Sequence, residues 1–211
     1  SPTSSAADFT ATLNEAGTGY WIVVAQGATA PTAAQVKAGV SYTGGTVVQA
    51  GNAAMTAATP ATFNITSLTP PGTAFTAYFV AEDSIGNLQA ATGNFNFTTA
   101  ATAPATPSIT VTPGNTQATL SFATPAANGA ALSGYTVTLG GGVNQILTLA
   151  NVTQGTTVTA NGYTATVTGV SGSNAVITVT GLTNGTGYYF SVKARNGAGS
   201  WSFAGNSDGI T

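Results

Sequence analysis

The stretch VTGLTNGTGYYFSVKARNGAG, residues 179–199, decides the fold class of this 211-residue chain. From Tyr188 to Arg195, aromatic and aliphatic residues alternate with more polar ones. A period of two with one apolar face is typical of a strand that covers a core. Turns rich in Thr, Asn and Gly stand on both sides. The stretch therefore predicts a β-strand held between two turns.

A second stretch, ITSLTPPGTAFTAYFVAEDSIGN at residues 65–87, repeats this arrangement in the first half of the chain. The length is sufficient for two small domains. The segment TTAATAPATPS (98–108) is rich in small residues and proline, has no apolar period and lies near the midpoint. We therefore expect a first domain at 1–100 and a second at 108–211.

Residues 101–107 between them are expected to form a linker. Pro104 and Pro107 would make it a semi-rigid joint rather than a loose tether.

Alternating apolar segments separated by turn residues continue through both halves of the chain. Asn161-Gly162 predicts a two-residue type I′ hairpin turn, because both positions of that turn need a positive φ. Residues 20–26 are apolar on both faces, so we expect that strand to be central. The predicted strands of the first half are 8–13, 20–26, 61–68, 73–83 and 93–99, and those of the second half are 108–112, 116–123, 133–139, 156–167 as a hairpin, and 174–180.

Residues 31–39 interrupt the β pattern of the first half. Thr32 and Gln35 have the spacing of a capping box, and Gly39 is a suitable stop for a short helix. The predicted fold class is all-β, with two tandem antiparallel β-sandwiches and one short helix in the first domain.

Only 4% of the residues are charged, against about 25% in ordinary proteins. Lys37, Lys193 and Arg195 are the only cationic side chains, so the chain cannot neutralise a nucleic-acid backbone or an anionic membrane surface. No apolar run approaches the roughly 18 residues of a membrane span. Because the chain has so few charges, the electrostatic repulsion between two copies is weak, which suits packing of copies against each other. The alternative is a neutral spacer whose polar groups are hydrated.

The absence of cysteine and histidine excludes thiol and imidazole chemistry. A carboxylate pair for glycoside hydrolysis needs two acids that face each other. Glu82 and Asp83 are adjacent, so on a strand they point to opposite sides. We expect no catalytic residue, no enzyme activity and no cofactor.

Asp83 and Asn87 in EDSIGN (82–87) are candidate calcium ligands. Calcium takes six to eight oxygen ligands, and this segment supplies too few. The alternative is a turn in which the side chains bond to their own backbone. We favour the turn.

Trp201, Tyr189 and Tyr42 are candidates for an aromatic platform that stacks on sugar rings. The alternative is an interface with a neighbouring domain or subunit, because aromatic residues are also enriched at interfaces. We favour the interface.

The second half resembles a fibronectin type III domain. The resemblance covers about 104–211 and rests on ATLSF (118–122), NGAALSGYTVTL (128–139) and VTGLTNGTGYYFSVKARNGAGSWS (179–202). It implies a structural tyrosine corner formed by Leu182 and Tyr188. The segment 141–169 is longer than the middle strands of the family, which implies an added hairpin or an extended edge.

The first half resembles a divergent relative of that family, one common as a repeat in large bacterial surface proteins. The likeness lies in TGYWIVVAQGATAPTAAQVKAG (18–39) and YFVAEDSIGNLQ (78–89). Here Leu68 is followed by Phe75 after a turn lengthened by two prolines, so the hydrogen bond of the corner is expected to be absent.

Both resemblances imply scaffolds. We expect a non-enzymatic, extracellular structural protein: a subunit of a bacterial surface fibre or an adhesin stalk, with copies of itself or neighbouring domains as partners. The start at Ser1 fits a processed, mature chain. Residues 1–7 and 202–211 are expected to be free to donate a strand to a neighbour. The alternative is a glycan-binding accessory module of a larger secreted enzyme.

Overall fold

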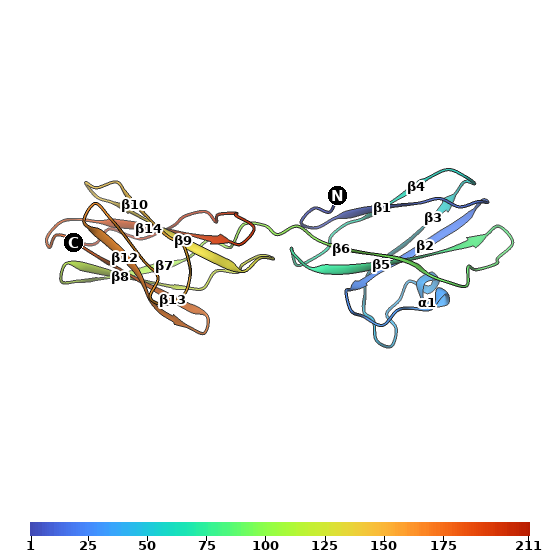
Figure 1. Ribbon diagram of the computed structural model, residues 1–211, viewed down its shortest axis with the longest axis horizontal. Coiled ribbons are helices and arrows are strands. Elements are labelled where there is room, and N and C mark those ends of the chain that lie inside the picture. Colours follow the sequence, from blue (N-terminus) through green and yellow to red (C-terminus); the bar gives the residue numbers. More distant parts are fainter. The chain divides into compact units, whose positions relative to one another are not determined.

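The computed structural model describes residues 1–211 and divides them into two compact units, Ser1–Ala101 and Thr102–Thr211 (Figure 1). All sheets are antiparallel, and the single helix lies in the first unit. These features confirm the predicted all-β class with one short helix.

The first unit contains a four-stranded sheet of order β3-β2-β5-β6 and a two-stranded sheet of order β1-β4. The strand β3 is not among the predicted strands, because small residues replace large apolar ones along most of it. The elements are β1 (Ala7–Ala11), β2 (Gly17–Ala25), α1 (Ala33–Ala38), β3 (Val47–Met55), β4 (Ala61–Ile65), β5 (Ala74–Asp83) and β6 (Gly93–Thr98).

β2 is central, as predicted, and both of its faces are buried. Trp21 and Val23 point into the core between the two sheets, whereas Ile22 and Val24 lie under the helix with Val36. The first unit therefore has three layers, with α1 covering the outer face of the larger sheet (Figure 1).

The helix α1 has the predicted caps. The Thr32 hydroxyl accepts from the Gln35 backbone N–H at 3.3 Å, and the Gln35 side chain accepts from the Thr32 N–H at 2.8 Å. Gly39 ends the helix in the left-handed conformation at φ 67°. These local bonds fix the ends of a helix only six residues long.

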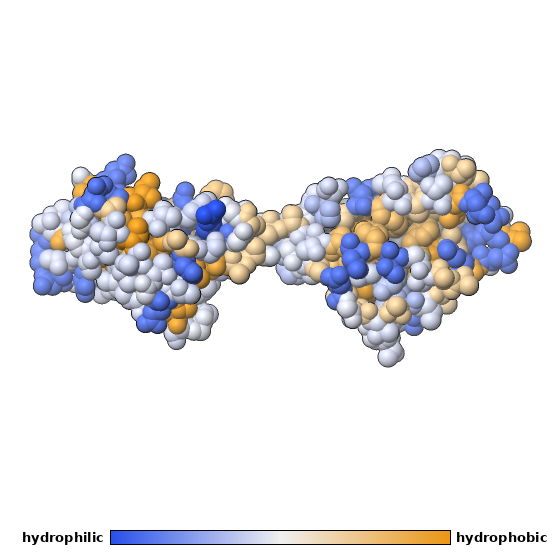
Figure 2. Space-filling model, viewed as in Figure 1, coloured by the Kyte–Doolittle hydropathy of each residue, from blue (hydrophilic) through white to orange (hydrophobic).

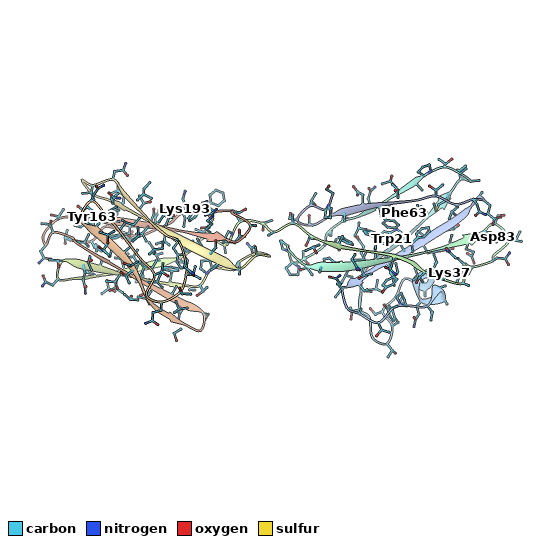
Figure 3. The ribbon with its side chains drawn as sticks, in the orientation of Figure 1. Trp21, Lys37, Phe63, Asp83, Tyr163 and Lys193 are labelled. Carbon is cyan, nitrogen blue, oxygen red and sulfur yellow. The ribbon has the colours of Figure 1, made fainter.

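Aromatic rings fill the space between the two sheets of the first unit (Figure 3). The rings of Phe9 and Phe63 stack with centroids 4.9 Å apart and planes 14° apart. Phe79 meets Phe63 edge-on at 5.4 Å. Such offset and edge-to-face contacts are the preferred arrangements of aromatic pairs.

The second unit has a five-stranded sheet of order β11-β12-β13-β8-β7 and a four-stranded sheet of order β10-β9-β14-β15. Aliphatic side chains dominate the core between them. The strands are β7 (Ile109–Gly114), β8 (Gln117–Ala123), β9 (Leu132–Gly140), β10 (Gln145–Leu149), β11 (Thr157–Ala160), β12 (Tyr163–Ser171), β13 (Asn174–Thr180), β14 (Tyr189–Asn196) and β15 (Gly205–Asn206).

The hairpin β11–β12 is the addition that the long middle segment implies, and it extends the sheet beyond β13. Asn161 and Gly162 join its strands with φ values of 51° and 84°. Both are positive, as the predicted type I′ turn requires.

The structure assigns residues 102–107 to the second unit, whereas the sequence placed 101–107 in a semi-rigid linker. Pro104 and Pro107 are buried in the second unit. The N–H groups of Thr102 and Ala105 donate to the carbonyls of Asn128 and Ala126 at 3.0 and 2.9 Å. The segment belongs to the second unit because its backbone groups find their partners there.

Every strand pairing of the first unit has a counterpart in the second. β1–β4 corresponds to β8–β13, β2–β3 to β9–β10, β2–β5 to β9–β14, and β5–β6 to β14–β15. The second unit has three strands without a counterpart, β7, β11 and β12.

Candidate functional site

The outer face of β14 carries the only cationic side chains of the second unit together with exposed aromatic rings. Lys193 and Arg195 alternate with buried residues and point outward (Figure 3). Arg195 pairs with Trp201, and its guanidinium lies 5.6 Å from the centre of the indole ring. Trp201 is 36% exposed. This face combines positive charge with apolar area.

Tyr189 lies on the same face at the other end of β14 and is 57% exposed. Its neighbour across the sheet is Gly140, where a Cβ atom would fall 2.0 Å from the tyrosine ring. The glycine therefore lets the ring lie against the sheet. Arg195 lies six positions after Tyr189, which is about 20 Å along the strand.

Tyr42 does not join this face, because it belongs to the first unit. Its hydroxyl donates to the Thr29 carbonyl at 2.7 Å, and its ring fills the space above Gly45. The structure thus places two of the three candidate aromatic residues, Tyr189 and Trp201, on one surface and leaves Tyr42 in a loop contact.

Leu182 and Tyr188 are both buried beside the turn that precedes β14. The Thr183 N–H donates to the Tyr188 hydroxyl oxygen at 3.1 Å. The tyrosine side chain thereby holds the turn, which is the arrangement that the resemblance implied for this pair.

The corresponding residues of the first unit, Leu68 and Phe75, are buried as well. Phe75 has no hydroxyl, and Thr99 bonds to the turn instead. The Thr73 N–H donates to the Thr99 hydroxyl at 2.9 Å, and that hydroxyl lies 3.3 Å from the Thr73 carbonyl. Thr99 was not among the predicted residues, and no local pattern marks it.

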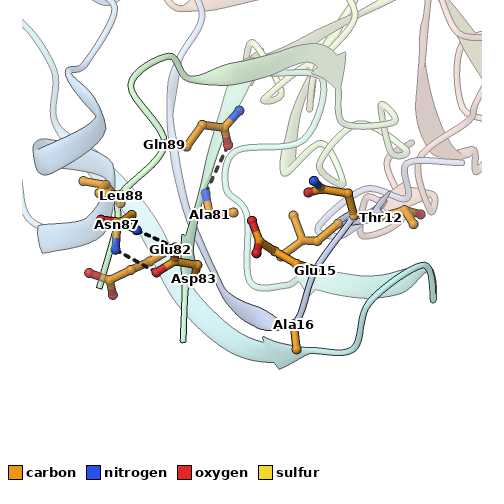
Figure 4. Close-up of a pocket in the computed structure, with 11 residues that line it drawn as sticks. Thr12, Glu15, Ala16, Ala81, Glu82, Asp83, Asn87, Leu88 and Gln89 are labelled. Atoms are coloured by element: carbon orange, nitrogen blue, oxygen red, sulfur yellow. Dashed lines mark hydrogen bonds between the residues drawn. The ribbon is translucent and has the colours of Figure 1, made fainter. Parts of the chain in front are cut away.

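Asp83 and Asn87 form the turn that the sequence favoured over a metal site. The Asp83 carboxylate accepts from the backbone N–H of Ile85 at 3.0 Å. It also accepts from the backbone N–H of Asn87 at 2.8 Å and from the Asn87 side chain at 2.7 Å (Figure 4). The bond from the Asn87 backbone is the main cause that lowers the pKa of Asp83. The Asn87 amide therefore presents its N–H, not its oxygen, to the carboxylate.

Glu82 points away from Asp83 and forms the one salt bridge of the chain, with Lys37 of α1. The Tyr20 hydroxyl donates to the same carboxylate at 3.1 Å. The bond to Lys37 lowers the pKa of Glu82, and it raises the pKa of Lys37 in turn.

A hollow of about 450 Å³ lies beside Glu82 and Asp83, and Glu15 lines it across from Asp83 (Figure 4).

Asn196 is a fully buried polar residue that the sequence analysis did not single out. Its side-chain N–H groups donate to the carbonyls of Thr102 and Ala127 at 2.7 and 3.1 Å, and its side-chain oxygen accepts from the Ser200 N–H at 3.2 Å. The residue joins the end of β14 to the segment that enters the second unit.

The two terminal segments are not free strands, which corrects the expectation of strand donation from them. Near the start, the carbonyls of Thr3 and Ser5 accept from Ala100 and Leu68. Near the end, Tyr188 and Ile210 exchange two backbone bonds of 2.7 Å. Both segments already have backbone partners within their own unit.

The single helix of the chain has six residues, and no helix is long and apolar enough to cross a membrane.

The family comparison agrees with the architecture of the second unit. The model of the fibronectin type III domain matches residues 102–207. No curated protein matches the chain in sequence. A solved structure that is similar is the crystal structure of the chicken CNTN1 FN1–FN3 domains, at 15% identity and a TM-score of 0.35 over 99% of this chain. The chain spans 62% of the length of that structure. Because the family match covers half of its residues, this protein belongs to the fibronectin type III family.

Proposed function

We propose that the chain is a non-enzymatic structural subunit of an extracellular bacterial surface fibre or adhesin stalk, which associates with copies of itself through sheet edges and low-charge surfaces. Fibronectin type III domains often serve as structural or adhesion modules and are generally non-catalytic. The more specific proposal, a fibre subunit or adhesin stalk, rests on the surface of this chain.

The observation that carries the proposal is the nearly uncharged surface. Hydroxyl groups replace ion pairs on the exposed sheet faces: Thr157 bonds to Thr166, Thr159 to Thr164, and Thr168 to Thr178, at 2.8 to 2.9 Å across neighbouring strands. Such pairs support the sheet without charge. Little electrostatic repulsion therefore opposes close approach of two copies.

Several strands also end a sheet with one side of the backbone unpaired. They are β1, β3, β4 and β6 in the first unit and β7, β10, β11 and β15 in the second. Unpaired edges are sites where another chain can add a strand, and proteins that avoid such pairing place charges there. Of these edge strands, only β1 carries a charged residue, Asp8.

We further propose that the first unit is a divergent copy of the same domain type. Its support is the correspondence of all its strand pairings with those of the second unit. Two such sandwiches in tandem are a suitable building block for a stalk.

Negative-stain electron microscopy over a concentration series at neutral pH tests the proposal. We expect regular filaments from the native chain and fewer from Ile146→Lys, which places a charge on the edge strand β10. Val176→Lys is the matched control, because Val176 lies on the partly exposed outer face of β13 and pairs with Gly169 of β12 and Ser121 of β8. Separate particles at every concentration would overturn the proposal.

A second candidate function, glycan binding, is favoured by one observation: Tyr189 and Trp201 are exposed on one sheet face. A glycan array with the native chain and with the Tyr189→Ala/Trp201→Ala variant tests it. Binding that the double variant loses and Val170→Ala keeps would support this function over assembly.

A further inference from the structure

The few charged side chains are divided unevenly between the two units. The first unit, Ser1–Ala101, contains one cation and four carboxylates, so its side chains have a net charge of −3. The second unit, Thr102–Thr211, contains two cations and one carboxylate, which gives a net charge of +1. Two units of the same kind therefore repel each other electrostatically, whereas the first unit of one copy attracts the second unit of another.

Both cations of the second unit lie on the outer face of the sheet β10-β9-β14-β15. Lys193 and Arg195 are exposed and stand two positions apart on β14, which is about 7 Å along the strand. Their partners on the neighbouring strand are Thr136 and Gly134, which are uncharged. Neither cation forms a salt bridge with Asp208, the one acid of this unit. The positive charge of this face is therefore not neutralised within the chain.

The same face has apolar area that its own unit does not cover. In the first unit, α1 covers Ile22 and Val24 on the equivalent face. In the second unit no helix is present, and Ile146 and Tyr189 on this face are 58% and 57% exposed. Figure 2 shows that the visible surface of the second unit is mostly of intermediate hydropathy, with strongly hydrophilic residues in separate areas. A partner on this face would cover apolar side chains and also meet the two cations.

The acids with charge to offer lie in the first unit, around the hollow beside β5. The salt bridge with Lys37 neutralises Glu82. The other two carboxylates of the hollow, Glu15 and Asp83, have no cationic partner. Glu15 is exposed, and Asp83 accepts only from uncharged N–H groups. Figure 2 shows hydrophilic residues gathered at the part of the first unit where Figure 3 labels Asp83.

We propose that the outer face of the second unit, at Lys193 and Arg195, binds the first unit of another copy at Glu15 and Asp83. Two cations would meet two carboxylates, and the long side chains that project from the sheet would enter the hollow. The ion pairs select the partner surface, whereas the apolar residues of the face add affinity. The contact joins two different surfaces, so each copy keeps one free surface of each kind and the contact can repeat head to tail.

This inference rests on the proposed function and adds the two surfaces and the direction of assembly. Sedimentation velocity of the full chain over a concentration series measures the contact without requiring filaments. We expect association at about 20 mM salt that weakens at about 300 mM salt, because salt screens exposed charges. Lys193→Gln/Arg195→Gln should lower the association constant by about tenfold.

The matched control is Gln117→Glu/Ser121→Glu, which changes the net charge of the second unit by the same amount. Both positions are exposed on β8, in the other sheet of that unit. This variant should keep the association constant within about twofold, since it leaves the cationic face intact. An equal loss in the control would assign the effect to net charge and would overturn the inference.

Reversing the charges identifies the two surfaces directly. Lys193→Glu/Arg195→Glu and Glu15→Lys/Asp83→Asn should each fail to associate alone, because like charges then meet or the acids are lost. A mixture of the two variants should associate again, since each reversed surface finds an opposite charge on the other variant. Asp83→Asn retains a side-chain oxygen for the turn with Asn87.

A native chain that stays monomeric at low salt, or a mixture that associates no more than its separate components, would overturn the inference. Binding of acidic sugars on the glycan array by such a monomeric chain would assign the face to that ligand instead. Filaments that persist in Lys193→Gln/Arg195→Gln would retain the proposed function and reject this contact. Salt-sensitive association that this variant loses, without filaments from the native chain, would retain the contact and reject the fibre.

Discussion

The two units use the same strand pairings but cover them differently. In the first, a helix covers the outer face of the four-stranded sheet, and only two strands lie over its inner face. In the second, the outer face of the equivalent sheet is open and five strands lie over the inner face. The shared pairings form a common framework in both units, whereas the covering elements decide which surfaces remain exposed.

The hydrophobic cores of the two units also differ in the side chains that fill them. The first unit has few strands to enclose its core and fills it with large aromatic rings, which bury much area per residue. The second has more strands and fills its core with Leu, Ile and Val. We infer that the stability of the first unit depends on fewer side chains, so single core changes should affect it more strongly.

The largest expected effect is on these two cores. Phe63→Ala should destabilise the first unit by about 4 kcal/mol, because it removes a stacked and fully enclosed ring. Leu120→Ala should cost the second unit about 3 kcal/mol. Calorimetry of the full chain should show two transitions, with each variant shifting only one. If Phe63→Ala shifted both transitions equally, the two units would not be independent.

The next largest effect on stability is expected at residues 102–107, where the chain enters the second unit. Asn196→Ala should destabilise that unit by about 2 kcal/mol, since it leaves the partly buried carbonyls of Thr102 and Ala127 without their donor. It should also speed amide exchange in residues 102–107. Denaturant unfolding and hydrogen exchange measure the two results.

Asn174→Ala is the control, because Asn174 is exposed and lies in a strand of the same unit. Unchanged exchange in 102–107 for Asn196→Ala would show that the prolines alone hold the segment.

A smaller effect is expected where each unit holds the turn before its long strand. Tyr188→Phe removes the acceptor of the Thr183 N–H, and Thr99→Val removes the acceptor of the Thr73 N–H. Each should cost its own unit about 1 to 2 kcal/mol. Thermal unfolding of both variants would compare the stabilising effect of the Tyr188 hydroxyl in the second unit with that of the Thr99 hydroxyl in the first. A neutral Thr99→Val would mean that the first unit does not need a substitute for the tyrosine hydroxyl.

The sequence predicted the features that depend on neighbouring residues. The capping box of Thr32 and Gln35 and the turn at Asn161-Gly162 are of this kind, because their bonds close within a few positions. The alternation of β14 likewise marks its buried face. The turn of Asp83 with Asn87 was also the favoured interpretation, for the same local reason.

The features that the sequence did not predict depend on distant partners. Asn196 bonds to a residue 94 positions away, and Thr99 to one 26 positions away. The packing of residues 102–107 against the second unit depends on such a long-range bond, from Asn196 to Thr102. The composition of the segment does not show this bond, and composition alone suggested a linker. The partners of the two terminal segments are also distant along the chain: Leu68 lies 63 positions after Ser5, and Ile210 lies 22 positions after Tyr188. A single sequence contains no local signal for such pairs.

The smallest expected effect separates the two units by their response to acid. Both carboxylates with a lowered pKa, Glu82 and Asp83, lie in the first unit. A lowered pKa in the folded state stabilises the protein above the unfolded pKa of about 4, and this contribution is lost as the pH falls through the folded value. Lowering the pH from 5 to 2 should therefore reduce the melting temperature of the first unit more than that of the second.

The variant Glu82→Gln/Asp83→Asn should reduce this difference, because neither amide titrates. At the alkaline end the sign is reversed: the raised pKa of Lys37 gives a contribution that is complete below its unfolded pKa of about 10.4 and is lost as the pH rises through the folded value. Calorimetry across pH, with the two transitions assigned by Phe63→Ala and Leu120→Ala, measures both limits. Parallel acid profiles of the two units in the native chain would show that neither carboxylate contributes to folding, and the hollow beside Asp83 would then be a surface feature without a role in stability.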